Sequence, residues 1–137
     1  MLQLDTNNHS VFSLNYHLIL VVKYRKKALS RKVMLDQIES MAREIGILHG
    51  IQVEEFNGEA DHVHFLLRAK PNTTMSAFIN SLKSATSRVL KRLFPEIRKK
   101  LWKEQFWSNS YCLITVGGAP LEVVKRYIES QNAPEVH

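Results

Sequence analysis

Two histidines, His62 and His64, flank a single valine in the segment HVHFLL and could act on one ligand together. Because side chains alternate between the two faces of a β-strand, both imidazoles would point to one face, while Val63 and Phe65 would point to the other. At about 3.3 Å per residue, their Cα atoms would lie roughly 7 Å apart, from where two imidazoles can converge on one metal ion. Either ring could equally be an ordinary structural or surface histidine. A pair of ligands also leaves a metal site incomplete.

The segment RYIESQ offers a third group, because Tyr127 and Gln131 are four residues apart and would share one helix face. Gln131 can give a metal ion its carbonyl oxygen, and Tyr127 can give a phenol oxygen to chemistry. A phenol has an unperturbed pKa near 10, so a cation on the attacked phosphate would help the reaction by polarising and orienting the phosphoryl group. Attack on phosphorus would leave a covalent phosphotyrosine that conserves bond energy for rejoining. The plainer interpretation is a half-buried tyrosine and a solvated glutamine.

The first half of the chain contains the elements that would position the histidines. Alternating apolar residues from Phe12 to Val22 predict a long strand. A helix follows, with Ser30 at its N-cap and Gly50 at its C-cap. Its inner face would carry Met34, Ile38, Met41, Ile45 and Leu48. The segments IQVEEFN and HVHFLLRA predict two strands joined as a hairpin by GEAD.

The second half predicts a second helix from Thr73 or Thr74; Pro95 either ends this helix or starts a short helical piece that runs to Leu101. Its inner face would carry Met75, Phe78, Ile79, Leu82, Ala85, Val89, Leu90 and Leu93. The segment FWSNSYCLITV predicts a strand with a tight turn at residues 108–110. After GGAP, a third helix would be anchored by Leu121, Val124 and Ile128.

This order of elements predicts an α+β, ferredoxin-like (split βαβ) antiparallel sheet, with helices on one face and an added C-terminal helix that carries Tyr127. We expect one domain in residues 1–137, with a body of about 10–116, a glycine hinge at 117–118 and a catalytic helix of about 120–132.

Composition indicates an ordinary globular chain, with 45% hydrophobic and 23% charged residues. The longest aliphatic stretch, Leu18 to Val22, is far shorter than the roughly 20 residues that a membrane span needs. No secretory signal opens the chain, and the single cysteine, Cys112, fits a reducing compartment. We therefore expect a cytoplasmic protein that does not enter a membrane.

The net charge is +6, and the basic residues are clustered. Such clusters favour nucleic acid as a partner, although a solvated basic face with no partner is an equal alternative. The candidates for phosphate contacts are Lys23, Arg25, Lys26, Lys27, Lys83 and Arg88. Trp102, Phe106 and Trp107 could stack on bases or belong to the core or an interface.

Five segments in this order resemble the HUH-superfamily single-tyrosine transposases of the smallest bacterial and archaeal insertion sequences, including the REP-associated tyrosine transposases. They are YHLILVVKYRKKAL, GEADHVHFLL, FINSLKSATSR, LWKEQFWSNSYCLITVGG and RYIESQ. The resemblance covers nearly everything from Phe12 to Gln131. HVH fills the histidine motif and YIESQ fills the tyrosine-helix motif.

The resemblance implies a metal-dependent enzyme that cleaves and rejoins single-stranded DNA at hairpin ends of an insertion sequence. Tyr127 would form a 5′-phosphotyrosine, and His62, His64 and Gln131 would hold Mg²⁺ or Mn²⁺. Two imidazoles alone would favour a softer ion, but phosphate and water oxygens can complete a hard shell. It also implies a homodimer that pairs through the strand near residues 111–116 and shares its active sites between subunits.

Several roles stay open in the sequence. His17, Glu59 and Asp61 could be extra ligands, groups that support a ligand, or structural residues. A non-catalytic protein that binds DNA or RNA hairpins and derives from such a transposase is an alternative function. A small metalloenzyme with a non-nucleic substrate is another, and the basic surface would then be incidental.

Overall fold

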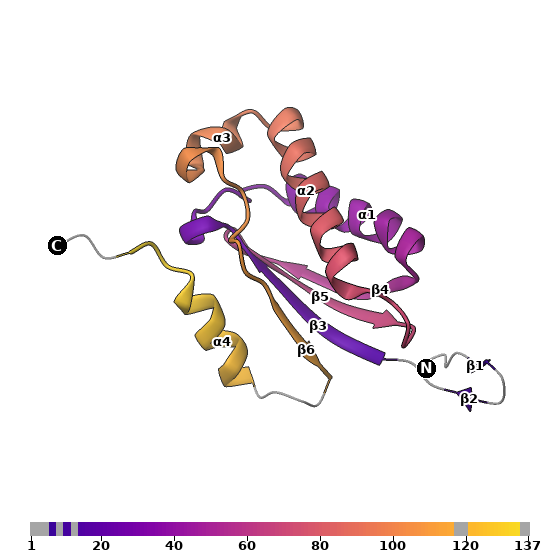
Figure 1. Cartoon of the computed structure of the whole chain (residues 1–137). Coiled ribbons are helices and arrows are strands. Elements are labelled where there is room, and N and C mark those ends of the chain that lie inside the picture. Colours follow the sequence, from indigo (N-terminus) through magenta and orange to yellow (C-terminus); the bar gives the residue numbers. More distant parts are fainter. Residues whose placement is uncertain (1–5, 8–9, 12–13, 117–120, 135–137) are drawn as a thin grey trace.

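The computed structural model describes residues 6–7, 10–11, 14–116 and 121–134, and its body is a four-stranded antiparallel sheet (Figure 1). The strand order is β4-β5-β3-β6, and the strands are β3 (Leu14–Val21), β4 (Ile51–Gly58), β5 (His62–Ala69) and β6 (Cys112–Thr115). Two long helices, α1 (Lys32–His49) and α2 (Met75–Leu93), cover one face of the sheet. This arrangement confirms the ferredoxin-like α+β prediction.

Smaller elements complete the described chain. The turn η1 (Lys23–Arg25) follows β3, while α3 (Glu96–Lys100) and the turn η2 (Trp102–Glu104) lie between α2 and β6. A two-stranded pair, β1 (Thr6–Asn7) and β2 (Ser10–Val11), precedes the body. The last helix, α4 (Leu121–Ser130), lies on the side of the sheet away from α1 and α2. None of the helices described is long and apolar enough to cross a bilayer.

Alternation along β5 separates the core from the histidines, as the sequence predicted. Val63, Phe65 and Leu67 are fully buried and join a core cluster that includes residues of both long helices. Burying each such side chain contributes about 1.5–3 kcal/mol, which fixes the face that β5 turns inward. His62 and His64 consequently occupy the opposite face and are half-buried. That face is not bare, because Ile19 and Val21 of β3 are also fully buried.

Strand register brings the ends of β3 and β5 together. Val21 lies opposite His62 and Ile19 opposite His64, and the β4–β5 hairpin closes with a hydrogen bond from Glu59 N–H to the His62 carbonyl oxygen at 2.9 Å. Val22 N–H also donates to the Asp61 carbonyl oxygen at 2.9 Å. The histidine pair therefore begins beside the turn that follows β3.

Some predicted details differ at the element ends. The N-cap of α1 is Arg31 rather than Ser30, without a side-chain cap, whereas Gly50 is the left-handed C-cap with φ of 70°. Leu48 and Leu93 are 82% and 47% exposed, so neither belongs to an inner face. Both lie in the last turns of their helices.

The segment 106–116 is a strand only from Cys112 onward. Phe106 and Trp107 turn into the core and are 3% and 7% exposed, so they are packing residues. Trp107 Nε1–H donates to the hydroxyl of Thr86, a buried α2 residue that the apolar pattern did not include, at 2.9 Å. Phe12, the hinge glycines Gly117 and Gly118, and the side chain of Leu121 lie outside the described residues.

Candidate active site

His62 is held by a carboxylate that precedes it in the chain. Its Nδ1–H donates to Asp61 Oδ1 at 2.8 Å, which leaves Nε2 outside this hydrogen bond and available to a ligand. Asp61 is only 6% exposed. Burial by itself would raise the pKa of Asp61, but the hydrogen bonds from His62 and Arg25 outweigh it and hold the pKa below its ordinary value. Asp61 is therefore an ionised support for His62 at neutral pH.

His64 meets a third histidine from the neighbouring strand. His17 Nδ1 and His64 Nε2 share a hydrogen bond of 2.8 Å. Burial, followed by the charges of His17 and His62, lowers the pKa of His64, so its ring is neutral at neutral pH, as metal binding requires. A nitrogen that shares this bond cannot bind a metal at the same time. Metal binding at His64 thus uses Nδ1 or displaces the His17 ring.

Arg25 joins this turn to the end of α4. Its Nε–H donates to Asp61 Oδ2 at 3.0 Å, and its Nη1–H donates to Asn132 Oδ1 at 3.1 Å. Both Arg25 and its neighbour Tyr24 have left-handed backbone angles, with φ of 55° and 56°. Few non-glycine residues adopt such angles, and they cluster at functional sites.

Tyr127 lies on α4 and faces the loop before β6. Its hydroxyl and that of Ser110 share a hydrogen bond of 3.1 Å. Burial raises the pKa of the Tyr127 phenol; the hydrogen bond with Ser110 opposes this, and Cys112 adds to it. The phenol is therefore protonated at neutral pH and must lose a proton before or during any attack.

Gln131 follows α4 and lines a hollow of about 230 Å³. Its amide nitrogen donates to Ser130 Oγ at 3.0 Å, while that hydroxyl donates to the Tyr127 carbonyl oxygen at 2.6 Å. The other lining residues are Lys23, Tyr24, Ser108, Asn109, Ser110, Ser130 and Asn132. The hollow is large enough for a small part of a nucleotide.

The donor set fits a metal only in part. Within the ranges that the structure describes, no three His, Cys, Asp or Glu side chains are placed to hold an ion. The two imidazoles and the Asp61 carboxylate that supports His62 suit a cation, and an amide oxygen from Gln131 would be a third donor of a different kind. His17 contacts His64, as its position on the first strand allowed, whereas Glu59 is exposed in the turn.

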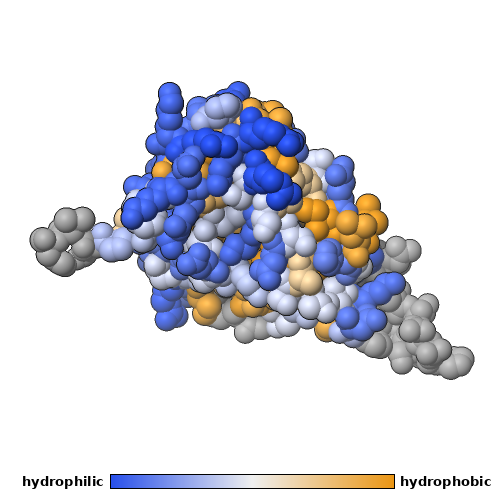
Figure 2. Space-filling model, turned by 45° about the horizontal axis from the view of Figure 1, so that its top comes forward, coloured by the Kyte–Doolittle hydropathy of each residue, from blue (hydrophilic) through white to orange (hydrophobic). Residues whose placement is uncertain are grey.

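The predicted phosphate contacts lie in different environments. Lys23 stacks over the Tyr24 ring at 5.1 Å from its centroid, and Arg88 is exposed beside a hollow of about 470 Å³ between α1 and α2. Lys26 is half-buried and Lys27 is exposed. Figure 2 shows that the end of the molecule formed by α3 and the C-terminal end of α2 is hydrophilic.

Lys83 has an inward role that the sequence did not predict. Its ammonium donates to the carbonyl oxygens of Ser108 and Asn109 at 2.8 and 3.3 Å. Burial lowers the pKa of this lysine. The residue therefore ties α2 to the loop that carries Ser110.

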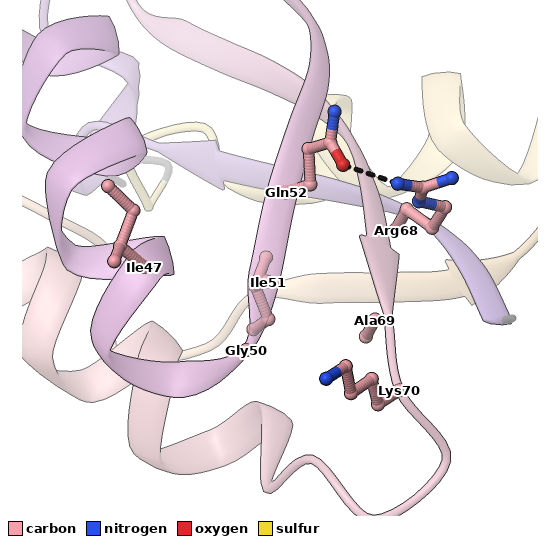
Figure 3. A pocket seen from close by; sticks show the side chains of 7 residues that line it. All are labelled: Ile47, Gly50, Ile51, Gln52, Arg68, Ala69 and Lys70. Atoms are coloured by element: carbon pink, nitrogen blue, oxygen red, sulfur yellow. Dashed lines mark hydrogen bonds between the residues drawn. The ribbon is translucent and has the colours of Figure 1, made fainter. Parts of the chain in front are cut away.

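A smaller hollow lies at the opposite end of β4 and β5 from the histidines (Figure 3). Its volume is about 180 Å³, and Ile47, Gly50, Ile51 and Lys70 are among its lining residues. The only hydrogen bond drawn there joins Arg68 to Gln52, and Arg68 also pairs with Glu54 at 3.3 Å. It contains none of the predicted site residues.

Sequence reasoning missed Asn132 and Ser110 as neighbours of the site. Asn132 directly follows the predicted ligand Gln131, and Ser110 lies in a loop rather than a periodic element. Neither position carries a local signal, since their partners are 107 and 17 residues away in the chain.

The chain thus combines a ferredoxin-like sheet that carries a histidine pair with a separate helix that carries a tyrosine. Comparison with known proteins identifies the class to which this combination belongs. The pattern of the family described as "Transposase IS200 like" matches residues 10–131. The chain belongs to this family of transposases, as the five segments of the sequence implied.

Relatives agree over nearly the whole chain. The ISDra2 transposase TnpA of Deinococcus radiodurans is 35% identical, over 98% of this chain and 95% of its own. The transposase for insertion sequence element IS200 of Salmonella typhimurium is 28% identical, over 90% of this chain and 80% of its own.

Solved structures give the same result. The crystal structure of a chain from Deinococcus radiodurans R1 described as a transposase has a TM-score of 0.83 and 32% identity, covering 95% of this chain and 99% of its own. A REP-associated tyrosine transposase bound to a REP hairpin shares the fold alone, with a TM-score of 0.56 and 8% identity over 85% of this chain and 62% of its own.

Proposed function

We propose that this transposase cleaves and rejoins single-stranded DNA through Tyr127, with a divalent metal ion, as a homodimer. The observation that carries the proposal is the series of contacts from His62 through Asp61 and Arg25 to Asn132. This series puts the end of α4, with Gln131, on the same side of the molecule as the histidine strand. Family membership supplies the DNA-processing class of reaction.

The chemical step is a displacement at phosphorus. The phenol oxygen of Tyr127 forms a bond to the scissile phosphate, the bond from phosphorus to the 3′ oxygen breaks, and the phenolic proton is lost as the leaving 3′ oxygen gains one. The products are a 5′-phosphotyrosine and a free 3′-hydroxyl. Attack by a 3′-hydroxyl reverses the step and rejoins the strand without ATP.

The metal ion would be held by His62, His64 and Gln131. When bound, it polarises the phosphate and offsets the charge that develops in the transition state. The chain's own contribution is to keep the His64 ring neutral and to hold His62 in one orientation through Asp61. The raised pKa of Tyr127 makes such help necessary at neutral pH.

The DNA partner would be a single strand with a hairpin end. A REP hairpin is the ligand of one protein that shares this fold, and the exposed cations Lys27 and Arg88 support phosphate binding here. Binding should then weaken with salt by a slope of about −0.7 per phosphate contact.

Dimerisation would occur through β6. This strand is one of the two outer strands of the described four-stranded sheet and pairs with β3 on one side, so a second copy could extend the sheet. In the single chain α4 contacts its own body through Tyr127–Ser110 and Arg25–Asn132. Mixing Tyr127→Phe subunits with His62→Ala subunits tests whether one active site takes its tyrosine and its histidines from the same subunit or from two subunits. Activity returns only if tyrosine and histidines come from different subunits.

The covalent intermediate tests the nucleophile. With a labelled single-stranded element end and Mn²⁺, the wild type should form a protein–DNA adduct that survives denaturing electrophoresis, and Tyr127→Phe should form none while still binding DNA. Tyr24→Phe is the matched control, because Tyr24 lines the same hollow and its ring packs on Trp102 at 5.1 Å. Adduct in Tyr127→Phe would assign the nucleophile to another residue. Hairpin binding without adduct, with Mg²⁺, Mn²⁺ and Zn²⁺ alike, would favour the non-catalytic binding protein.

A further inference from the structure

One guanidinium touches the immediate neighbours of two proposed metal ligands that come from different elements. Asp61, which accepts from Arg25 Nε–H, precedes His62, and Asn132, which accepts from Nη1–H, follows Gln131. The two contacts are 3.0 and 3.1 Å long and span 36 and 107 residues of sequence. Within the described chain, Arg25 thus connects the histidine turn to the end of the tyrosine helix.

The segment that carries Arg25 is fixed by backbone hydrogen bonds. Arg25 N–H donates to the Val22 carbonyl oxygen at 2.7 Å, and Lys23 N–H donates to the Phe106 carbonyl oxygen at 2.8 Å. Tyr24 and Arg25 are two consecutive residues with positive φ. Left-handed angles are unfavourable at non-glycine residues, so the surrounding structure must hold them.

The end of α4 is equally well defined at the contact. Gln131 N–H and Asn132 N–H donate to the carbonyl oxygens of Ile128 and Glu129 at 3.1 and 3.2 Å, which continues the helical turn past Ser130. A contact at Asn132 therefore fixes the position of Gln131, one residue away. Arginine suits this role because its rigid planar fork holds several N–H donors at fixed, separated positions, whereas a lysine donates from a single nitrogen at the end of a flexible stem.

We propose that Arg25 is a positioning residue that sets the spacing between the histidine pair and Gln131, and hence assembles the metal site from β5 and α4. This inference rests on the proposed function of His62, His64 and Gln131 as metal ligands. It assigns Arg25 a structural task in place of the phosphate contact expected from its charge. Asp61 then orients His62, and Asn132 docks the helix.

Four variants separate these tasks, and all readouts are taken on the full chain without DNA. Asp61→Asn removes the charge beside His62, Asn132→Ala removes the helix contact, and Arg25→Lys keeps the charge but loses the fork. Lys27→Gln is the matched control, because it removes an exposed cation two residues away. Thermal melts confirm that each variant is folded. The test uses Arg25→Lys, so it does not depend on whether a more drastic substitution of Arg25 folds.

Mn²⁺ affinity and amide hydrogen exchange at residues 128–132 are the two measurements. Asp61→Asn should weaken Mn²⁺ binding about 10- to 100-fold and leave helix exchange unchanged. Asn132→Ala should speed exchange about two- to fivefold, as expected for one exposed hydrogen bond. Arg25→Lys should both weaken Mn²⁺ binding and speed amide exchange, while Lys27→Gln should change neither quantity.

A double variant gives the sharpest result. Arg25 acts on His62 through Asp61, so adding Arg25→Lys to Asp61→Asn should not disturb His62 further. The double variant should therefore bind Mn²⁺ more weakly than Asp61→Asn only by the factor that Asn132→Ala alone produces. Wild-type Mn²⁺ affinity together with wild-type exchange in Arg25→Lys would overturn the assignment. Absence of adduct in the wild type would instead remove the proposed reaction and leave these metal readouts intact.

Discussion

Replacing Lys83 by methionine tests whether this lysine holds the loop beside the active site or contacts DNA. The structure places its ammonium 2.8 Å from the Ser108 carbonyl oxygen and 3.3 Å from that of Asn109. Methionine keeps the length and apolar stem of the side chain but cannot donate. The Ser108 carbonyl, on a residue that is 4% exposed, then loses this donor.

The expected loss of stability combines two opposing effects. An unsatisfied buried acceptor costs about 1–3 kcal/mol. Burial also lowers the pKa of Lys83, so removing its charge recovers part of a desolvation cost. The net loss should be about 1 kcal/mol, which corresponds to a fall in Tm of about 3–4 °C for a domain of this size.

Urea denaturation measures this loss as a lower midpoint with an unchanged m-value. Faster amide exchange at residues 108–110 should accompany it. Arg88→Met is the control on the same helix, because Arg88 is exposed. It should change stability by less than about 0.5 kcal/mol and reduce the salt slope of single-strand binding by about 0.7. Wild-type stability in Lys83→Met, together with a reduced salt slope, would refute the reasoning.

Two further predictions concern the fold around the site. Gly46→Ala should lower stability by about 1–3 kcal/mol in urea denaturation even though alanine favours helices, because its Cβ would lie 2.5 Å from the Ile51 carbonyl oxygen; a gain in stability would contradict this close packing. The lowered pKa of Asp61 means that the ionised carboxylate stabilises the folded state. This stabilisation is present above the ordinary pKa of 3.8 and is lost as the pH falls through the lower pKa of the folded state. The stability difference between wild type and Asp61→Asn should therefore shrink as the pH falls below 3.8. A difference that has already vanished at a higher pH would assign the carboxylate another partner.

Local patterns predicted the elements that carry the chemistry. The alternation around His62 and His64 requires both rings to share the face opposite Phe65, and the structure confirms that arrangement. Gly50 ends α1 as predicted because its left-handed φ favours glycine. Such features depend on residues within a few positions of one another, which is the range that periodicity describes.

Other features were outside that range. Ser30 is not the cap of α1, and the strand predicted over residues 106–116 shrinks to four residues because Phe106 and Trp107 enter the core. Lys83 and Arg25 have the same charge as the surface cations around them, so composition could not tell an inward side chain from an outward one.

The local pattern of the sequence identified the candidate ligands and the candidate nucleophile, and it predicted the strand that carries the histidines and the helix that carries the tyrosine. Three contacts became visible only in three dimensions: His17 meets His64, Lys83 holds the 108–110 loop, and Arg25 bridges Asp61 and Asn132. These contacts depend on strand register and helix docking, which are set by the packing of the whole core. Their partners lie 25 to 107 positions apart in the chain, so they leave no mark in the local pattern.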